Sequence, residues 1–186
     1  MSARKEFVIG VSGASGAPYA RRLLEVLANG ADVHLIVTDQ ARGIAAREGV
    51  TYDDLDVTRH RSDDLAAAIA SGSHRIDGMA VVPCSTKTLA SIATGLSASL
   101  LARAADVTLK ERRPLILLVR EMPLSRIHLK NLLAADEAGA TVMVASPGFY
   151  GRPATIEDLV DMVVGRVLDH LGVEHALGPR WTGYDD

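Results

Sequence analysis

A strand ending and a helix beginning meet in Val81-Val82-Pro83-Cys84-Ser85-Thr86-Lys87-Thr88. The apolar run before and into this stretch predicts a strand, and we expect Pro83 to stop it because its ring fixes φ and removes a hydrogen-bond donor. Ser85 then stands at the position of a helix N-cap, where its hydroxyl can accept a bond from a backbone N–H two or three residues on. Such a unit is either an ordinary capped turn or an anion site at the edge of an α/β sheet.

A second turn of this kind lies near the start of the chain. The apolar run 7–11 predicts a buried strand, the small residues of 12–18 follow, and 21–27 shows helical spacing. The turn lacks the Gly-Lys-Ser/Thr of a P-loop, and Ser12 stands where a dinucleotide-binding motif has its middle glycine. Because small residues allow a backbone to approach a phosphate, this turn is a second candidate for ligand binding.

Apolar runs and helical patterns alternate along the rest of the chain. Further strands are predicted at 33–37, 78–82, 115–119 and 141–144, and helices at 40–48, 63–71, 88–94, 98–111, 125–138 and 155–171, with polar loops over 51–62. Five apolar strands separated by helices predict an open parallel sheet covered on both faces. The predicted fold is α/β, a single-domain Rossmann- or flavodoxin-like three-layer sandwich with a mostly parallel sheet, spanning 1–186 with a C-terminal tail from about 173.

The composition is that of one globular domain. The 186 residues are 48% hydrophobic but only 4% aromatic, which predicts an aliphatic core. The net charge of −3 gives no case for nucleic-acid binding, and a single cysteine fits a reducing compartment. The polar start does not have the pattern of a signal peptide, and no apolar run approaches the roughly 20 residues of a membrane span. We therefore expect a cytoplasmic protein with neither nucleic-acid nor membrane partners.

Polar side chains follow the predicted strands at their carboxyl ends, where open α/β sheets bind ligands. They are Ser12, Ser15, Thr38, Ser85, Thr88, Arg120, Glu121 and Tyr150. Arg120 and Glu121 form either a solvated ion pair or a phosphate clamp beside a general acid or base. Lys110 near a helix C-terminus is explained equally well by the helix dipole.

Neither a metal site nor a nucleophilic cysteine is expected. None of the six histidines pairs with another at the three- or four-residue spacing of helical ligand sets. His128 is the best placed, but a structural role explains it more simply, and His34 is predicted to be a strand residue. No base for Cys84 can be identified, so we predict a small buried side chain.

Read together, these segments resemble the UbiX-type flavin prenyltransferases, within the larger group of homo-oligomeric, flavin-binding, flavodoxin-like proteins. The resemblance spans nearly the whole chain. The segments that carry it are Gly10-Val11-Ser12-Gly13-Ala14-Ser15-Gly16, Ala70-Ser71-Gly72-Ser73, Asp77-Gly78-Met79, Pro83-Cys84-Ser85, Arg103-Ala104-Ala105-Asp106-Val107, Leu109-Lys110-Glu111-Arg112, Arg120-Glu121-Met122-Pro123-Leu124, Ile127-His128-Leu129, Phe149-Tyr150 and Arg180-Trp181.

The resemblance implies a metal-independent transfer of a dimethylallyl group from dimethylallyl phosphate to reduced FMN, first at N5 and then at C6. The product, prenylated FMN, would serve a UbiD-type decarboxylase. The residues implied for FMN are Gly13, Ala14, Ser15, Thr38, Ser85, Thr88 and Arg103, and those for dimethylallyl phosphate are Lys110, Arg120, Tyr150, Arg166 and Trp181. Glu121 and Ser12 match proton-handling positions, with Lys110 and Arg120 also in the catalytic set, and Glu48 is a further candidate.

The resemblance also implies a homo-oligomer, as large as a dodecamer. We expect the Ala-rich stretches 66–69 and 90–105 to supply part of its contact surface. Three departures from the family pattern concern the shape of the pocket: Thr38 in place of serine, His74 in place of an aromatic residue, and Ala145-Ser146 before Phe149-Tyr150.

Two alternative functions stay open. A flavin-dependent decarboxylase of the same fold is favoured by the Pro-x-Ser turn and the histidines, but its Pro-x-Met-Asn segment is replaced by Met122-Pro123-Leu124. A non-catalytic flavin carrier or accessory subunit is the other. Flavin storage has no need of the charged set Lys110, Arg120, Glu121 and Arg166, which argues against it.

Overall fold

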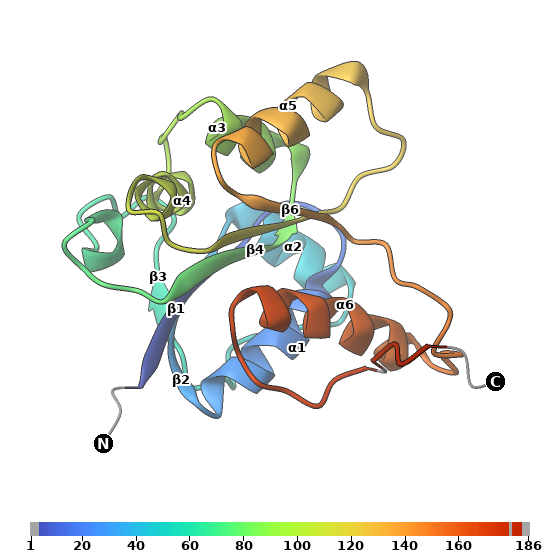
Figure 1. Ribbon diagram of the computed structural model, residues 1–186. Coiled ribbons are helices and arrows are strands. Elements are labelled where there is room, and N and C mark those ends of the chain that lie inside the picture. The colour runs from blue at the N-terminus through green and yellow to red at the C-terminus, as the bar shows by residue number, and fades with distance from the viewer. Residues whose placement is uncertain (1–3, 179, 184–186) are drawn as a thin grey trace.

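One parallel sheet forms the centre of the computed structural model, which describes residues 4–178 and 180–183 (Figure 1). Its strands are β1 (Lys5–Val11), β2 (Ala31–Val37), β3 (Thr58–His60), β4 (Gly78–Cys84), β5 (Leu115–Val119) and β6 (Thr141–Val144). They lie in the order β3-β2-β1-β4-β5-β6, and every pairing is parallel. The order reverses between β1 and β4, so the carboxyl ends of these two strands flank the point where such sheets bind ligands.

Helices cover both faces of the sheet. They are α1 (Ala17–Ala28), α2 (Asp39–Arg47), α3 (Thr86–Ala93), α4 (Leu100–Lys110), α5 (Arg126–Glu137) and α6 (Ile156–His170), with a short 3-10 helix η1 (Ala68–Ala70). One apolar core packs α1, α2 and α6 against one face, and a second packs η1, α3, α4 and α5 against the other (Figure 1). Along β1, Phe7 and Ile9 enter the first core and Val8 enters the second, as the pleat of a strand requires. The predicted three-layer α/β fold is confirmed.

The helices begin where the sequence places N-caps. The hydroxyl oxygens of four residues each accept a bond of 3.1–3.3 Å from the backbone N–H three residues on: Ser85, Ser99, Ser125 and Thr155. Gly95 and Gly139 follow α3 and α5 at φ of 69° and 103°, a conformation that favours glycine at helix ends. Local capping chemistry therefore fixes where the chain leaves the sheet and returns to it.

Pro83 does not stop β4, contrary to the sequence prediction. The strand continues through Pro83 to Cys84, and the Val82–Pro83 peptide bond is cis. Val81 lies opposite Leu117 whereas Cys84 lies opposite Val119, so β4 carries one extra residue at this point. Proline is tolerated in a sheet at such an irregularity, because the partner strand needs no hydrogen bond from the N–H that proline lacks.

Two further predictions differ from the structure. No α-helix forms over 63–71, where turns and η1 stand instead, because Asp64 uses its carboxylate to accept the backbone N–H of Ala66 at 3.2 Å. The edge strand β3, in the segment predicted as loop, pairs with β2 although its sequence Thr-Arg-His has no apolar pattern. The single-domain prediction over 1–186 stays a prediction, since 1–3, 179 and 184–186 lie outside the described residues.

Among the described residues, none of the helices combines the length and the apolar character that crossing a lipid bilayer demands.

Candidate functional site

The first candidate site is a cavity of about 450 Å³ at the carboxyl ends of β1, β2 and β4, which we call the strand-end cavity. The first turns of α2, α3 and α4 converge on it, so three positive helix ends face one space. Its lining residues are mostly polar: Gly13, Thr38, Asp39, Gln40, Ser62, Ser85, Thr86, Lys87, Thr88, Ser91, Ala98, Ser99 and Ala102. The structure thus brings together Gly13, Thr38, Ser85 and Thr88 of the predicted FMN set.

Ser12 lies buried beside this cavity and joins the ends of two strands. Its hydroxyl donates to the carbonyl oxygen of Pro83 at 3.1 Å and accepts the backbone N–H of Ser85 at 2.8 Å. Its own N–H donates to the same carbonyl at 3.1 Å. The residue therefore holds the end of β1 against the end of β4. Its predicted part in proton handling stays a prediction.

The turn after β1 approaches its neighbours closely. A Cβ on Gly13 would lie 2.9 Å from the Cβ of Gln40, so only glycine fits there. Ala14 is buried, while Ser15 is exposed and accepts a bond from Nε of Arg120 at 3.3 Å. Arg120 and Ser15 are thus adjacent, as a shared site requires.

Glu48 faces the same turn from the end of α2. Its carboxylate accepts the backbone N–H of Gly16 at 3.1 Å and that of Ala17 at 2.7 Å, and so occupies the N-terminus of α1. The positive end of α1 is therefore already occupied by Glu48. The helix starts that remain to attract a ligand anion are those of α2, α3 and α4. The structure places Glu48 at the edge of the site, and its membership of the site stays a prediction.

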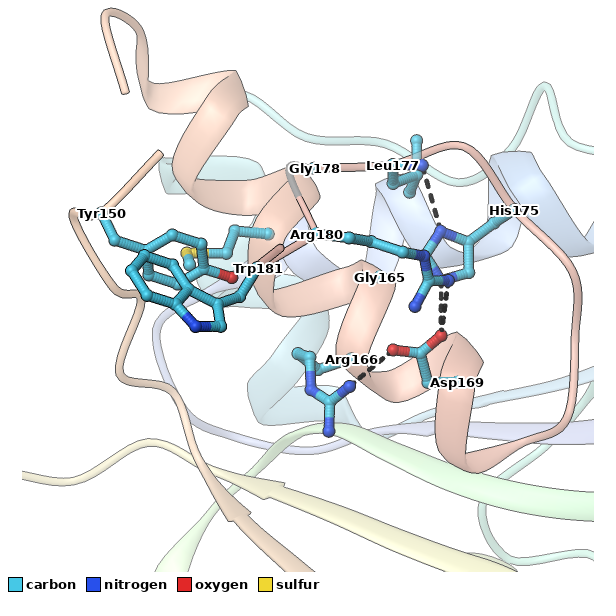
Figure 2. Close-up of a pocket in the computed structure, with 10 residues that line it drawn as sticks. Tyr150, Gly165, Arg166, Asp169, His175, Leu177, Gly178, Arg180 and Trp181 are labelled. Atoms are coloured by element: carbon cyan, nitrogen blue, oxygen red, sulfur yellow. Dashed lines mark hydrogen bonds and ion pairs between the residues drawn. The ribbon is translucent and has the colours of Figure 1, made fainter. Parts of the chain in front are cut away.

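The second candidate site is a cavity of about 390 Å³ between α6, the loop after β6 and the C-terminal segment, which we call the α6 cavity (Figure 2). It brings together Tyr150, Arg166 and Trp181 of the predicted substrate set. The rings of Tyr150 and Trp181 meet edge to face, with centroids 5.6 Å apart and planes at 83°. In a protein with only 4% aromatic residues, two rings at one cavity mouth form a rare apolar wall.

Charged groups surround Asp169 at the other end of this cavity (Figure 2). Arg166 donates to its carboxylate at 2.7 Å, Arg180 at 2.9 Å and Nε2 of His175 at 3.1 Å. Nδ1 of His175 accepts the N–H of Leu177 at 3.0 Å, which leaves Nε2 as the protonated nitrogen. Burial raises the pKa of Asp169, but the bonds from Arg180 and His175 outweigh it and hold that pKa below its ordinary value. Arg166 is exposed, so its guanidinium can leave Asp169 and bind the phosphate of a ligand instead.

Arg120 and Glu121 lie outside the linings of both cavities, which share no residue within the described chain. Oε1 of Glu121 accepts the N–H of Met122 at 3.0 Å. In the part of the chain that the structure describes, no ion pair joins Arg120 to Glu121, so the solvated-pair interpretation is wrong.

Arg103 and Lys110 line neither of the two cavities. Both are on α4, which runs from the carboxyl edge of the sheet back to the amino edge, where β5 begins. Arg103 bonds the carbonyl of Ala70 at 3.2 Å and Asp106 at 2.9 Å, and Lys110 pairs with Glu111. One chain therefore does not assemble the whole predicted set. Matching a family motif identifies residue types but says nothing about which edge of the sheet each one reaches.

Two other features bear on the sequence analysis. Cys84 is fully buried, which confirms the predicted buried side chain, and this burial raises the pKa of its thiol to about 12. The sequence analysis missed Gln40, Lys87 and Ser99 in the strand-end cavity, although Ser99 carries the signal of a helix N-cap.

Comparison with known proteins places the chain among relatives. The family model described as Flavoprotein matches residues 1–168. A flavin prenyltransferase UbiX of Deinococcus radiodurans is 50% identical over 94% of this chain and 92% of its own length. One from Methanocaldococcus jannaschii is 44% identical over 95% and 98%.

Solved structures show the same relationship. A dodecameric FMN-dependent UbiX-like decarboxylase from Escherichia coli O157:H7 superposes with a TM-score of 0.91, 44% identity, and coverage of 96% of this chain and 100% of that one. AnUbiX (PadA1), in complex with FMN and dimethylallyl pyrophosphate, also gives 0.91, with 40% identity and coverage of 98% and 100%. On this similarity over nearly its full length, the chain belongs to the flavoprotein family and, within it, to the UbiX-type flavin prenyltransferases.

Proposed function

We propose that this protein is a flavin prenyltransferase, which transfers a dimethylallyl group from dimethylallyl phosphate to reduced FMN and releases prenylated FMN. The observation that carries the proposal is identity of 44–50% to flavin prenyltransferases over more than nine-tenths of both chains. It is supported by the two cavities, which separately have the chemistry that a flavin nucleotide and an allylic phosphate require. We further propose that a UbiD-type decarboxylase uses the product.

The strand-end cavity fits FMN. Three helix starts and Lys87 offer positive charge to the phosphate, and the hydroxyls of Thr38, Ser85 and Thr88 offer hydrogen bonds to a polar ligand. When it is bound in reduced form, FMN supplies the nucleophilic nitrogen of the reaction. The protein residues hold and orient it, with Ser12 fixing the floor of the cavity.

The α6 cavity fits the allylic phosphate. Arg166 offers a charge-assisted bond to a phosphate, and the faces of Tyr150 and Trp181 stabilise an allylic cation when the phosphate departs. An apolar wall also keeps water from the cation, which would otherwise become an alcohol. Arg120 and Glu121 follow β5 and do not line this cavity; we assign them as the clamp and the acid that act on the phosphate as it leaves.

A second copy of the chain completes the site in this proposal. Arg103 and Lys110 are seven residues apart, about two turns, so they project from one face of α4. Neither residue lines the strand-end cavity of its own chain, and their side chains are 39% and 52% exposed, so this face is available to another copy. The partner copy would then supply Arg103 to the FMN phosphate and Lys110 to the allylic phosphate.

The apolar surface available for assembly lies on α5. Helix α5, which is described in full, buries only Ala135, while Ile127, Leu129 and Leu133 are 70%, 52% and 58% exposed. Of the expected surface over 90–105, the part from 100 onwards does not contribute, because α4 buries its alanines and leucines in its own chain, whereas Leu96 is 61% exposed. We propose a homo-oligomer of the kind that the Escherichia coli O157:H7 relative forms as a dodecamer.

The test is to incubate the purified protein with reduced FMN and dimethylallyl phosphate without oxygen, and to measure the mass of the flavin. We expect a flavin heavier by one C₅H₈ unit, formed only when both substrates and the protein are present. Parallel reactions with the diphosphate settle which phosphate form is preferred. Flavin that binds but keeps its mass with either phosphate would contradict the proposal and favour a flavin carrier.

A decarboxylase is the second candidate, because two similar structures carry that description. One is the relative from Escherichia coli O157:H7 and the other is a phenylacrylic acid decarboxylase from Aquifex aeolicus, 41% identical with a TM-score of 0.88. The same protein is therefore incubated with FMN and phenylacrylic acid, and released carbon dioxide is measured. Release by the protein alone, with no change in flavin mass, would support the decarboxylase.

A further inference from the structure

Outside both cavities, two histidines from different elements meet at one carboxylate, and a third histidine contacts one of the two. Glu6 lies in β1, His34 in β2, and His74 in the loop before β4. Oε1 of Glu6 lies 2.6 Å from Nε2 of His34 and 2.5 Å from Nε2 of His74. His60 of β3 completes the group, since its Nε2 lies 2.8 Å from Nδ1 of His34. Because the four come from separate segments, no spacing in the sequence predicts their meeting.

A fixed backbone holds these side chains. The N–H of Glu6 donates to Asp77 at 2.7 Å, and the N–H of Asp77 returns a bond of 2.7 Å to the carbonyl of Glu6. Arg113 holds the loop by a bond of 2.8 Å to the carbonyl of His74. The side chains of Glu6, His34 and His74 are 25%, 16% and 31% exposed, so a small ion can reach them from solvent.

The ligand atoms suit a transition metal. One carboxylate oxygen and two imidazole nitrogens lie within 4.8 Å of one another. Zinc is held by such sets of three protein ligands at about 2.0–2.2 Å with water as the fourth, which separates tetrahedral ligands by about 3.3 Å. The carboxylate oxygen therefore needs to move away from each nitrogen by less than about 1 Å. Calcium and magnesium prefer sites made of oxygen ligands and do not match.

A metal-binding imidazole needs a hydrogen-bond partner for its other ring nitrogen, which we call the outer contact. His60 supplies this contact for His34. When Nε2 of His34 binds a metal, its proton is on Nδ1, which then donates to Nε2 of His60. This chain of contacts fixes both the tautomer and the orientation of His34.

We propose that Glu6, His34 and His74 form a binding site for a divalent first-row transition-metal ion such as Zn²⁺, with His60 positioning His34. None of the four residues lines either cavity, so the proposal stands independently of prenyl transfer. A bound ion joins β1, β2 and the loop before β4. Since it binds the folded chain and not the unfolded one, it stabilises the fold.

The experiment is a calorimetric titration of the tag-free, chelator-treated protein with zinc chloride, paired with thermal unfolding. We expect saturable binding of one ion per chain and a rise in Tm as zinc is added. His74→Asn and Glu6→Gln each weaken binding by at least about tenfold, and His60→Phe by about 10- to 100-fold through the outer contact. His170→Asn, at an exposed position on α6, is the matched control and keeps the wild-type affinity.

Two results would overturn the proposal. One is the absence of saturable zinc binding by the wild-type protein, a result that does not depend on whether any variant folds correctly. The other is wild-type affinity in both His74→Asn and Glu6→Gln, which would place the ion elsewhere. The FMN affinity of each variant serves as the check on folding, because the strand-end cavity shares no residue with the cluster in the described chain.

Discussion

Among single residues, Glu121 is the one whose proposed role a conservative substitution tests most clearly. Its carboxylate touches the backbone N–H of Met122, and no ion pair to Arg120 appears among the described residues, so Glu121→Gln removes a proton without breaking a salt bridge. We expect FMN to bind almost normally, while formation of prenylated FMN slows by about 10²–10⁴-fold, the usual range for an acid–base group. Single-turnover kinetics measured by flavin mass check this.

A contrary result for this variant has a defined meaning. Turnover at the wild-type rate would show that another group donates the proton. Loss of FMN binding would show that Glu121 belongs to the flavin half of the site. Glu174→Gln, at an exposed position after α6, is the matched control and should change neither measurement.

The strand-end cavity leads to a prediction about the flavin phosphate. In the proposed assignment, the helix starts and Lys87 bind the phosphate of FMN and have no charged partner in riboflavin. Losing one charge-assisted contact costs about 1.5–3 kcal/mol, so riboflavin should bind roughly 10- to 150-fold more weakly than FMN. Quenching of flavin fluorescence gives both affinities. Equal affinities would contradict the assignment of the phosphate to this cavity.

At the scale of elements, the C-terminal segment docks on α6 through Asp169. The folded-state pKa of Asp169 lies below its ordinary value, so the stability it contributes is present above about pH 4 and is lost as the pH falls through the folded pKa. We expect Trp181, the sole tryptophan, to shift its emission to longer wavelength over that acidic range as the segment detaches. The measurement is fluorescence from pH 6 downwards.

Asp169→Asn tests the cause of this transition. The variant lacks the carboxylate that binds Arg166, Arg180 and His175, so its emission should resemble the detached form already at neutral pH. An acid transition identical to that of the wild type would assign it to another carboxylate. Asp56→Asn, at an exposed position in the loop before β3, is the control.

A helix or strand can be predicted from the sequence when the residues that determine it lie within the element itself. Strands β5 and β6 and the caps Ser85 and Thr155 follow from local residues, and the structure agrees with them. The edge strand β3 and the path through Pro83 depend on partner strands, which no local pattern encodes. The same limit applies to the site. Residue types at strand ends could be predicted, but the separation of Lys110 from Arg120 follows from the direction of α4 across the sheet.

For the whole molecule, the exposed apolar face of α5 predicts self-association. Leu129→Glu and Leu133→Glu place charges where another copy would bury apolar surface, and should convert the oligomer to smaller species in light scattering. Leu65→Glu is a matched control, because Leu65 and Leu129 are both 52% exposed and Leu65 lies in the turn before η1. A wild-type protein that is monomeric at micromolar concentration would remove the basis for this prediction.

A site shared between copies makes a distinct prediction for mixtures. Lys110→Ala and Glu121→Gln should each be nearly inactive, but oligomers assembled from both should recover activity in about a quarter of their sites. Those sites combine an intact Lys110 from one chain with an intact Glu121 from another. Product formation by the co-refolded mixture is the measurement. If the mixture stays as inactive as its parts, both residues serve the same chain, and the shared site is refuted.

The hydrogen bonds of the Ser12 hydroxyl determine when the floor of the strand-end cavity becomes ordered. The hydroxyl bonds both Pro83 and Ser85, which belong to the chain itself, so the two strand ends are locked together when the chain folds. The conformational entropy of this cavity floor is therefore lost during folding and not again during flavin capture. Association then needs no slow rearrangement of the floor, and the residence time of the flavin is set by how strongly the rim holds it.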